Sequence, residues 1–161
     1  GDSPMPAGLG LHPYFPIPLT PSGNRADCTV QVPCNRYWQL EDCIPTGERP
    51  EVSGRFDLRN PERLDDKAYD DVWTDVERKD ARSSAFYADP GSGATIEMRA
   101  DKTFREIVLY APEDRPVISL EPYTCATNAF NLESRGIDAG TVMLNPDEAL
   151  HGKMEIQVTR N

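Results

Sequence analysis

A histidine and a glutamate lie among apolar residues, an environment that can suit an acid or a base to proton transfer. His12 lies among leucine, proline and aromatic residues. The favoured interpretation is that it is a core residue whose imidazole donates a hydrogen bond to a backbone carbonyl. Glu121 directly follows the apolar run 117–120. A carboxylate at the end of a buried strand is desolvated, which raises its pKa and suits it to proton transfer; a strand-end charge that points to water is an equal alternative. The two side chains are candidates for an acid and a base.

Two adjacent carboxylates, Asp70 and Asp71, lead into a β-prone segment that contains Trp73. Because neighbours in a strand point to opposite faces, at most one of the two can face a given pocket. The pair is a weak signal for a divalent cation, since no further spaced carboxylates accompany it, and solvated turn residues are the favoured interpretation. Trp73 and Trp38 can stack on the apolar face of a sugar, although core packing is the favoured use of each.

The cysteines give little support for a metal site. Cys28, Cys34, Cys43 and Cys125 lack C-x-x-C spacing, and the chain has only two histidines. We therefore predict no metal. A disulfide among these cysteines stays open as an alternative, whereas reduced, buried or half-buried thiols in a cytoplasmic protein are the favoured interpretation.

β-Strands must position these side chains, because the chain has 15 prolines in 161 residues, about twice the ~5% average, and proline interrupts long helices. Residues 28–32 and 154–159 alternate apolar and polar with period two, which predicts half-buried strands. Further short β-prone runs, separated by turn residues, lie between them at 72–76, 84–88, 94–98, 104–110 and 117–120. The pattern predicts an all-β sandwich or barrel.

Some segments depart from simple alternation. The run 104–110 ends in four consecutive apolar residues, which predicts a strand covered on both faces. Residues 1–24 and 44–66 are rich in proline, glycine and charged residues with weak periodicity, so we expect ordered loops there. Long loops of this kind are candidates for function.

Length and charge limit the classes of partner. The 161 residues correspond to about one domain, and no run of about 18 apolar residues is present that could span a membrane. The net charge of −10 opposes binding to nucleic acid or to an anionic membrane surface. The first residues show no signal-peptide pattern. Neutral or cationic partners fit this composition better.

Five segments, taken in chain order, resemble the C-terminal part of the aldose 1-epimerase (galactose mutarotase-like) family. They are Gly10-Leu-His-Pro-Tyr-Phe15, Ile44-Pro-Thr-Gly-Glu48, Tyr69-Asp-Asp-Val-Trp73, Leu120-Glu-Pro-Tyr-Thr124 with Asn128-Ala-Phe-Asn131, and Leu144-Asn-Pro-Asp-Glu148. The resemblance covers nearly the whole chain. It implies an antiparallel β-supersandwich of which residues 1–161 form the C-terminal part.

The resemblance also implies chemical roles. His12 would be the general acid that protonates the ring oxygen of a sugar, and Glu121 the general base on the anomeric hydroxyl. Opening a pyranose needs both proton transfers in one event. Asp70 would accept hydrogen bonds from a sugar hydroxyl, and no metal or organic cofactor is implied.

Aromatic residues beside these motifs are candidate walls of a sugar pocket. Tyr14, Tyr123 and Trp73 can stack on sugar C–H faces, with core packing weighted above ligand contact for each. Two positions depart from the family pattern: Asn128 stands where the family commonly has aspartate, and Asp147 where it has glycine. The second departure puts in doubt a turn that needs positive φ.

The implied function is interconversion of the α and β anomers of a free hexose such as glucose or galactose, a small-molecule partner. One alternative is a non-catalytic carbohydrate-binding module on the same fold. Another is a mutarotase of phosphorylated hexoses, which needs basic residues at the pocket; Arg36, Arg55 and Arg105 are available. Full-length relatives carry a preceding half with further sugar-binding residues. We therefore expect this chain to need an N-terminal half, in the same chain or as a second chain, for activity.

Overall fold

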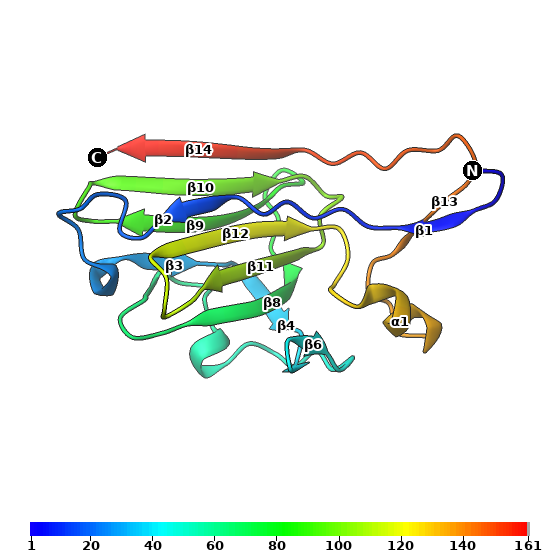
Figure 1. Cartoon of the computed structure of the whole chain (residues 1–161), viewed down its shortest axis with the longest axis horizontal. Helices are drawn as coiled ribbons and strands as arrows, with labels where there is room; N and C mark the ends of the chain where they lie inside the picture. Colours follow the sequence, from blue (N-terminus) through cyan, green and yellow to red (C-terminus); the bar gives the residue numbers. More distant parts are fainter. Residues whose placement is uncertain (161) are drawn as a thin grey trace.

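Two five-stranded antiparallel sheets make up most of the computed structural model, which describes residues 1–160 (Figure 1). Sheet I has the strand order β2-β12-β11-β8-β4, formed by β2 (Tyr14–Pro16), β12 (Val117–Tyr123), β11 (Glu106–Ala111), β8 (Tyr69–Val76) and β4 (Cys34–Tyr37). Sheet II has the order β14-β10-β9-β3-β7, formed by β14 (Met154–Arg160), β10 (Ala94–Ala100), β9 (Ser83–Asp89), β3 (Thr29–Gln31) and β7 (Glu62–Arg63). The all-β prediction is confirmed.

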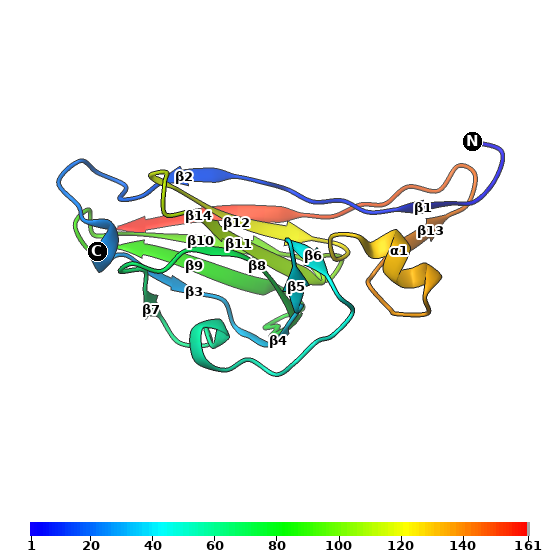
Figure 2. The same ribbon diagram turned by 60° about the horizontal axis from the view of Figure 1, so that its bottom comes forward.

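Small elements extend from one end of the two sheets. Strand β1 (Met5–Ala7) pairs with β13 (Val142–Leu144), and the two lie beyond the sheets with helix α1 (Ala129–Ser134) nearby (Figure 2). A second short pair, β5 (Leu40–Glu41) and β6 (Ile44–Pro45), lies beside sheet I. Single 3-10 turns cover 25–27 and 54–56. No helix of residues 1–160 is long and apolar enough to cross a membrane.

The main core lies between the two sheets. Strands β9 and β10 alternate strictly between buried and half-buried residues, as period-two patterning requires. Large side chains from both sheets are buried there, including Tyr69, Trp73, Tyr87, Met98 and Leu109.

A second apolar cluster covers part of the outer face of sheet I. Val72 of β8 and Val108 of β11 pack there with Trp38 and with Leu132 of α1. The first four residues of β11 are all buried as a result. The prediction that the run 104–110 is covered on both faces is confirmed.

The long segments 1–24 and 44–66 contain more structure than expected. They hold β1, β2, β6, a 3-10 turn and β7, so the expectation of loops alone was wrong. These strands are only two or three residues long, and β2 pairs with β12 about a hundred residues further along the chain. Local periodicity cannot reveal a strand whose stability comes from such distant pairing.

Two residues that depart from the family pattern adopt left-handed backbone conformations. Asp147 has φ 66° and Asn128, the residue before α1, has φ 60°. Aspartate and asparagine tolerate this region better than other residues that carry a side chain. The turn at Asp147 therefore does use positive φ, and aspartate meets that requirement without glycine.

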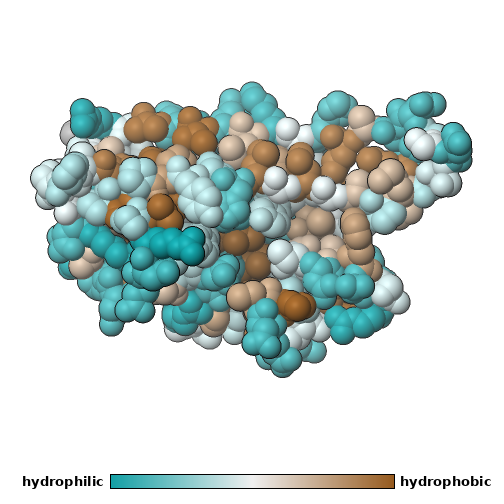
Figure 3. Space-filling view, viewed as in Figure 1, coloured by the Kyte–Doolittle hydropathy of each residue, from teal (hydrophilic) through white to brown (hydrophobic). Residues whose placement is uncertain are grey.

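Sheet II extends past sheet I at its β14 edge. Ile156 and Val158 pair with the buried Met98 and Ile96 of β10, so all four side chains share the inner face. Ile156 and Val158 are nevertheless 43% and 63% exposed. Brown, hydrophobic side chains line the upper edge of the molecule over β14 (Figure 3). Sheet I therefore leaves the inner face of β14 uncovered.

Candidate active site

The register of sheet I sets polar and apolar side chains in rows on its outer face. Residues that stand opposite one another on β12, β11 and β8 are Glu121, Val108 and Val72 in one row and Ser119, Tyr110 and Asp70 in the next. Because directly opposed residues in antiparallel strands present their side chains on the same face, both rows point outward together. All of these residues except Ser119 line a pocket of about 310 Å³.

The segment before β2 places His12 at this pocket. Leu11 N donates to the Pro122 carbonyl at 3.2 Å, and Tyr14 pairs with Ser119. The segment thus runs along β12, and His12 Nε2 lies 3.0 Å from Glu121 Oε1. The imidazole side chain is 41% exposed, whereas the carboxylate side chain is 2% exposed.

Glu121 is held from two sides. The Tyr123 hydroxyl donates to Glu121 Oε2 at 2.9 Å. Burial raises the pKa of Glu121, and the Tyr123 hydrogen bond and the charge of His12 partly offset that rise. The His12 contact at Oε1 lies at ion-pair distance but outside hydrogen-bonding angles, so within residues 1–160 this oxygen has no hydrogen-bond donor. It is an acceptor that a ligand hydroxyl can satisfy.

A glycine lets the tyrosine reach Glu121. Gly10 bridges to Tyr123 on the edge of β12, and a Cβ at Gly10 would lie 2.8 Å from the Tyr123 ring. That separation is too short for any side chain unless the ring shifts. Tyr123 therefore packs against the Gly10 backbone, in the position from which its hydroxyl meets the carboxylate.

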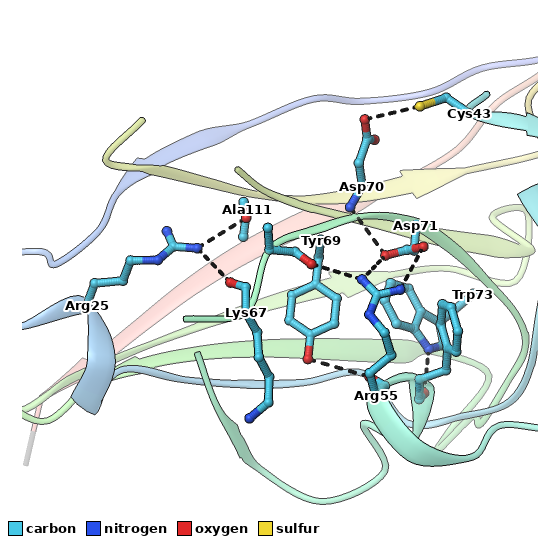
Figure 4. Close-up of polar contacts among 11 residues, drawn as sticks. Arg25, Cys43, Arg55, Lys67, Tyr69, Asp70, Asp71, Trp73 and Ala111 are labelled. Atoms are coloured by element: carbon cyan, nitrogen blue, oxygen red, sulfur yellow. Dashed lines mark hydrogen bonds and ion pairs between the residues drawn. The ribbon is translucent and has the colours of Figure 1, made fainter. Parts of the chain in front are cut away.

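Asp70 and Asp71 take opposite faces, as alternation requires (Figure 4). Asp71 accepts two hydrogen bonds from Arg55, at 3.3 and 2.7 Å, on the face away from the pocket. Asp70 lines the pocket, where the Cys43 thiol donates to its Oδ2 at 3.7 Å. One carboxylate is therefore neutralised by a cation and the other faces the pocket.

The expectation that Trp73 walls a sugar pocket is wrong. Trp73 is 0% exposed, lies in the core between the sheets and donates from Nε1 to the Phe56 carbonyl at 2.9 Å (Figure 4). Tyr69 and Asp71 are four and two residues before Trp73 and share its inward face of β8, whereas Asp70 is three residues before it and takes the other face. Trp73 and Asp70 therefore point to opposite sides of sheet I.

Tyr14 and Tyr123 do lie at the pocket with His12, Asp70 and Glu121. The Tyr14 ring centroid is 4.5 Å from that of His12, and its hydroxyl is 3.5 Å from His12 Nε2. The Tyr14 ring is exposed and forms a side wall. The structure thus brings together every proposed site residue except Trp73.

Sequence reasoning missed Tyr110 and Cys43, which line the pocket, and Ser119, which is buried against His12. Ser119 lies two residues before Glu121, and Tyr110 two residues after Val108, so strand alternation could have found them. Cys43 comes from the turn between β5 and β6, where it has φ 62°, and its position had no local signal. It and the other three cysteines carry free thiols.

The chain is a β-sandwich protein in which a half-exposed histidine and a buried glutamate meet at an outward-facing pocket. The family model described as aldose 1-epimerase matches residues 1–157, so the chain belongs to the aldose 1-epimerase family. The fold is the galactose mutarotase-like β-sandwich.

Solved structures of similar fold support this assignment of architecture. A galactose mutarotase-like protein from Clostridium acetobutylicum matches 99% of this chain with a TM-score of 0.85 and 18% identity, over 49% of its own length. An aldose epimerase homologue from Caenorhabditis elegans matches 99% with a TM-score of 0.77 and 16% identity, over 53% of its length. A Synechocystis protein matches the whole chain with a TM-score of 0.73 and 24% identity, over 47% of its length. The chain therefore spans about half the length of these relatives.

Proposed function

We propose that this chain carries the acid–base pair of an aldose 1-epimerase, which interconverts the α and β anomers of a free hexose. The observation that carries the proposal is the 3.0 Å contact between His12 Nε2 and Glu121 Oε1 at the floor of a pocket. A proton donor and a proton acceptor this close can act on two neighbouring oxygens of one ligand. The anomeric hydroxyl and the ring oxygen of a pyranose are such a pair, since both are bonded to C1.

Glu121 and His12 together supply and accept every proton that the proposed reaction moves. Glu121 takes the proton from the anomeric hydroxyl, the C1–ring oxygen bond breaks as the C1 carbonyl forms, and His12 Nε2 gives its proton to the ring oxygen. Rotation about C1–C2 then presents the other face of the aldehyde. The reverse transfers close the ring as the other anomer and return both protons to their starting positions.

The remaining pocket residues suit a neutral sugar. Asp70 offers an acceptor to a hydroxyl, and the exposed Tyr14 ring offers an apolar face to sugar C–H groups. No lysine or arginine is among the described residues that line the pocket. The lining therefore favours an uncharged hexose over a phosphorylated one, because phosphate recognition uses basic side chains.

The arginines that could have bound a phosphate lie elsewhere. Arg36 and Arg105 line a different pocket of about 720 Å³, and Arg105 pairs with Asp138 there. Arg55 pairs with Asp71 on the inward side of sheet I. None of the three converges on His12 and Glu121.

We also propose that the active protein includes a second half of the sandwich. The chain spans about half of its structural relatives, and the apolar inner face of β14 at Ile156 and Val158 has no cover within the described residues. Further strands packed there would bury that apolar surface. The same half would supply the rest of the sugar contacts, so residues 1–161 alone are expected to show little or no turnover.

Polarimetry on freshly dissolved α-D-glucose and α-D-galactose tests the function. The full product of the gene should accelerate mutarotation, and its His12→Asn and Glu121→Gln variants should be at least 10²-fold slower, the usual contribution of a general acid or base. Unchanged rates in both variants would sink the assigned roles. Sugar binding in calorimetry without any acceleration by the wild type would instead support a non-catalytic carbohydrate-binding module.

A further inference from the structure

Ser119 lies beneath His12 in a buried position that the proton transfers do not use. It precedes Glu121 by two residues on β12, and it is 0% exposed. Its Oγ donates to the Pro13 carbonyl at 2.7 Å and lies 3.1 Å from His12 Nδ1. The serine thus contacts the imidazole nitrogen that faces away from Glu121.

The single proton of the Ser119 hydroxyl indicates the direction of the hydrogen bond between Ser119 and His12. A hydroxyl has one proton, and a carbonyl oxygen can only accept. The Ser119 proton is therefore used by Pro13, at the shorter of the two distances. With its proton on the Pro13 carbonyl, Ser119 Oγ presents lone pairs to His12, an arrangement that suits a proton on Nδ1.

We propose that Ser119 is a positioning residue that holds a proton on His12 Nδ1 and so makes Nε2 the nitrogen that exchanges a proton with the ligand. The catalytic consequence rests on the proposed function, whereas the position of the proton does not. With Nδ1 occupied, a second proton on the ring makes an imidazolium, which is a usable acid. Without Ser119 the neutral ring is free to carry its one proton on Nε2. A neutral ring that gives up that proton becomes an imidazolate, so it is a much weaker acid than an imidazolium.

The contact on the other side of the ring agrees with this assignment. Nε2 lies at ion-pair distance, 3.0 Å, from Glu121 Oε1, so a proton on Nε2 lies beside a carboxylate even though the N–H is not aligned with Oε1 for a hydrogen bond. Because the Nδ1 proton is committed to Ser119, this is the one mobile proton of the pair. It lies on the side of the ring that faces the pocket, beside the Tyr14 hydroxyl.

Nitrogen-15 NMR of the 161-residue chain tests the proton position directly. The chain has two histidines, and His151 is exposed and remote in sequence from the pocket, so it is an internal reference. Long-range ¹H–¹⁵N spectra should show His12 Nδ1 protonated across the pH range in which the fold is intact, with only Nε2 changing. A wild-type spectrum with a bare Nδ1 and a protonated Nε2 would overturn the proposal, whatever the variants do.

Ser119→Ala and Ser119→Thr extend the test to the role of the hydroxyl. Ser119→Ala should move the His12 nitrogen shifts toward the Nε2-protonated form and leave those of His151 unchanged, while Ser119→Thr should restore the wild-type pattern. Unchanged His12 shifts in a folded Ser119→Ala chain would contradict the assignment. If Ser119→Ala does not fold, the wild-type spectrum still decides.

Kinetics of the full gene product separate this inference from the proposed function. Ser119→Ala should lower kcat by roughly 10- to 100-fold with little change in KM. A loss of this size is seen when the outer hydrogen-bond partner of a metal-ligating histidine is removed. Ser119→Thr should recover most of that loss. If the wild type shows no mutarotation but His12 Nδ1 is protonated, the proposed function fails and the proton position stands. A KM effect alone, or no effect on an active enzyme, would contradict the catalytic consequence.

Discussion

Two buried glutamates lie on the same face of sheet I with different surroundings. Glu121 of β12 and Glu106 of β11 are 1% and 0% exposed. Burial raises the pKa of each. Glu121 faces a pocket and has His12 at 3.0 Å, whereas Glu106 accepts from Trp38 Nε1 at 3.1 Å and lies beside the apolar cluster of Trp38, Val72 and Val108.

Burial alone therefore does not distinguish a candidate catalytic carboxylate from a structural one. A desolvated acid holds its proton more tightly, and both glutamates share that property. Acid–base chemistry also needs a partner that exchanges a proton and a pocket that admits a ligand. Glu121 contacts His12 and lines a pocket, while Glu106 is hydrogen-bonded to an indole that only donates. The pKa direction by itself would have selected both residues.

Exchanging each glutamate for glutamine gives the largest expected contrast. Glu121→Gln removes the base and should lower kcat in polarimetry of the full gene product by about 10²- to 10⁴-fold. Glu106→Gln keeps a carbonyl oxygen for Trp38 Nε1 and should leave kcat unchanged. Comparable losses in the two variants would break the distinction between the two sites.

Removing the indole donor should destabilise the Glu106 region. Trp38→Phe keeps most of the apolar volume but leaves Glu106 Oε2 without its Trp38 hydrogen bond. An unsatisfied buried acceptor costs about 1–3 kcal/mol, which urea unfolding of the 161-residue chain can measure. The same substitution made in the Glu106→Gln background should cost less, because a neutral amide is cheaper to leave unpaired than a carboxyl group that can ionise. Equal costs in both backgrounds would argue against the hydrogen bond as the cause.

The smallest expected effect is on how the free energy of unfolding changes with pH, and the direction of that change is well defined. Because burial raises the pKa of Glu106, the folded state binds its proton more tightly than the unfolded state does. Raising the pH from the ordinary glutamate value of about 4.3 toward the raised value therefore lowers the free energy of unfolding, by about 1.4 kcal/mol for each unit of pKa difference.

Glu106→Gln removes this contribution. The free energy of unfolding of the variant minus that of the wild type should therefore increase with pH across that window, in urea unfolding at matched pH values. Glu155→Gln is a suitable control, since the lowered pKa of this surface residue predicts a change of the opposite sign, at pH values below the ordinary glutamate value. A flat difference for Glu106→Gln would mean that its carboxyl group is not desolvated.

Much of the site could be predicted from linear order. The motifs around His12, Asp70 and Glu121 identify three residues that the structure places around one pocket. Strand alternation also predicted that Asp70 and Asp71 would separate, and they do. Ser119 was within reach of the same rule, because it is two residues from Glu121 on a strand.

Local patterns in the chain were enough to predict the all-β class, the alternating strands β9 and β10 and the family motifs, because period-two burial and short turns are local properties. The face of β8 that forms the pocket depends instead on contacts between distant segments. Both faces of that strand carry apolar and polar residues, so alternation separates Trp73 from Asp70 without saying which side a second sheet will cover. Tertiary packing likewise decided the fates of Glu121 and Glu106, since a hydrogen-bond partner far along the chain and an open or filled pocket are set by distant contacts.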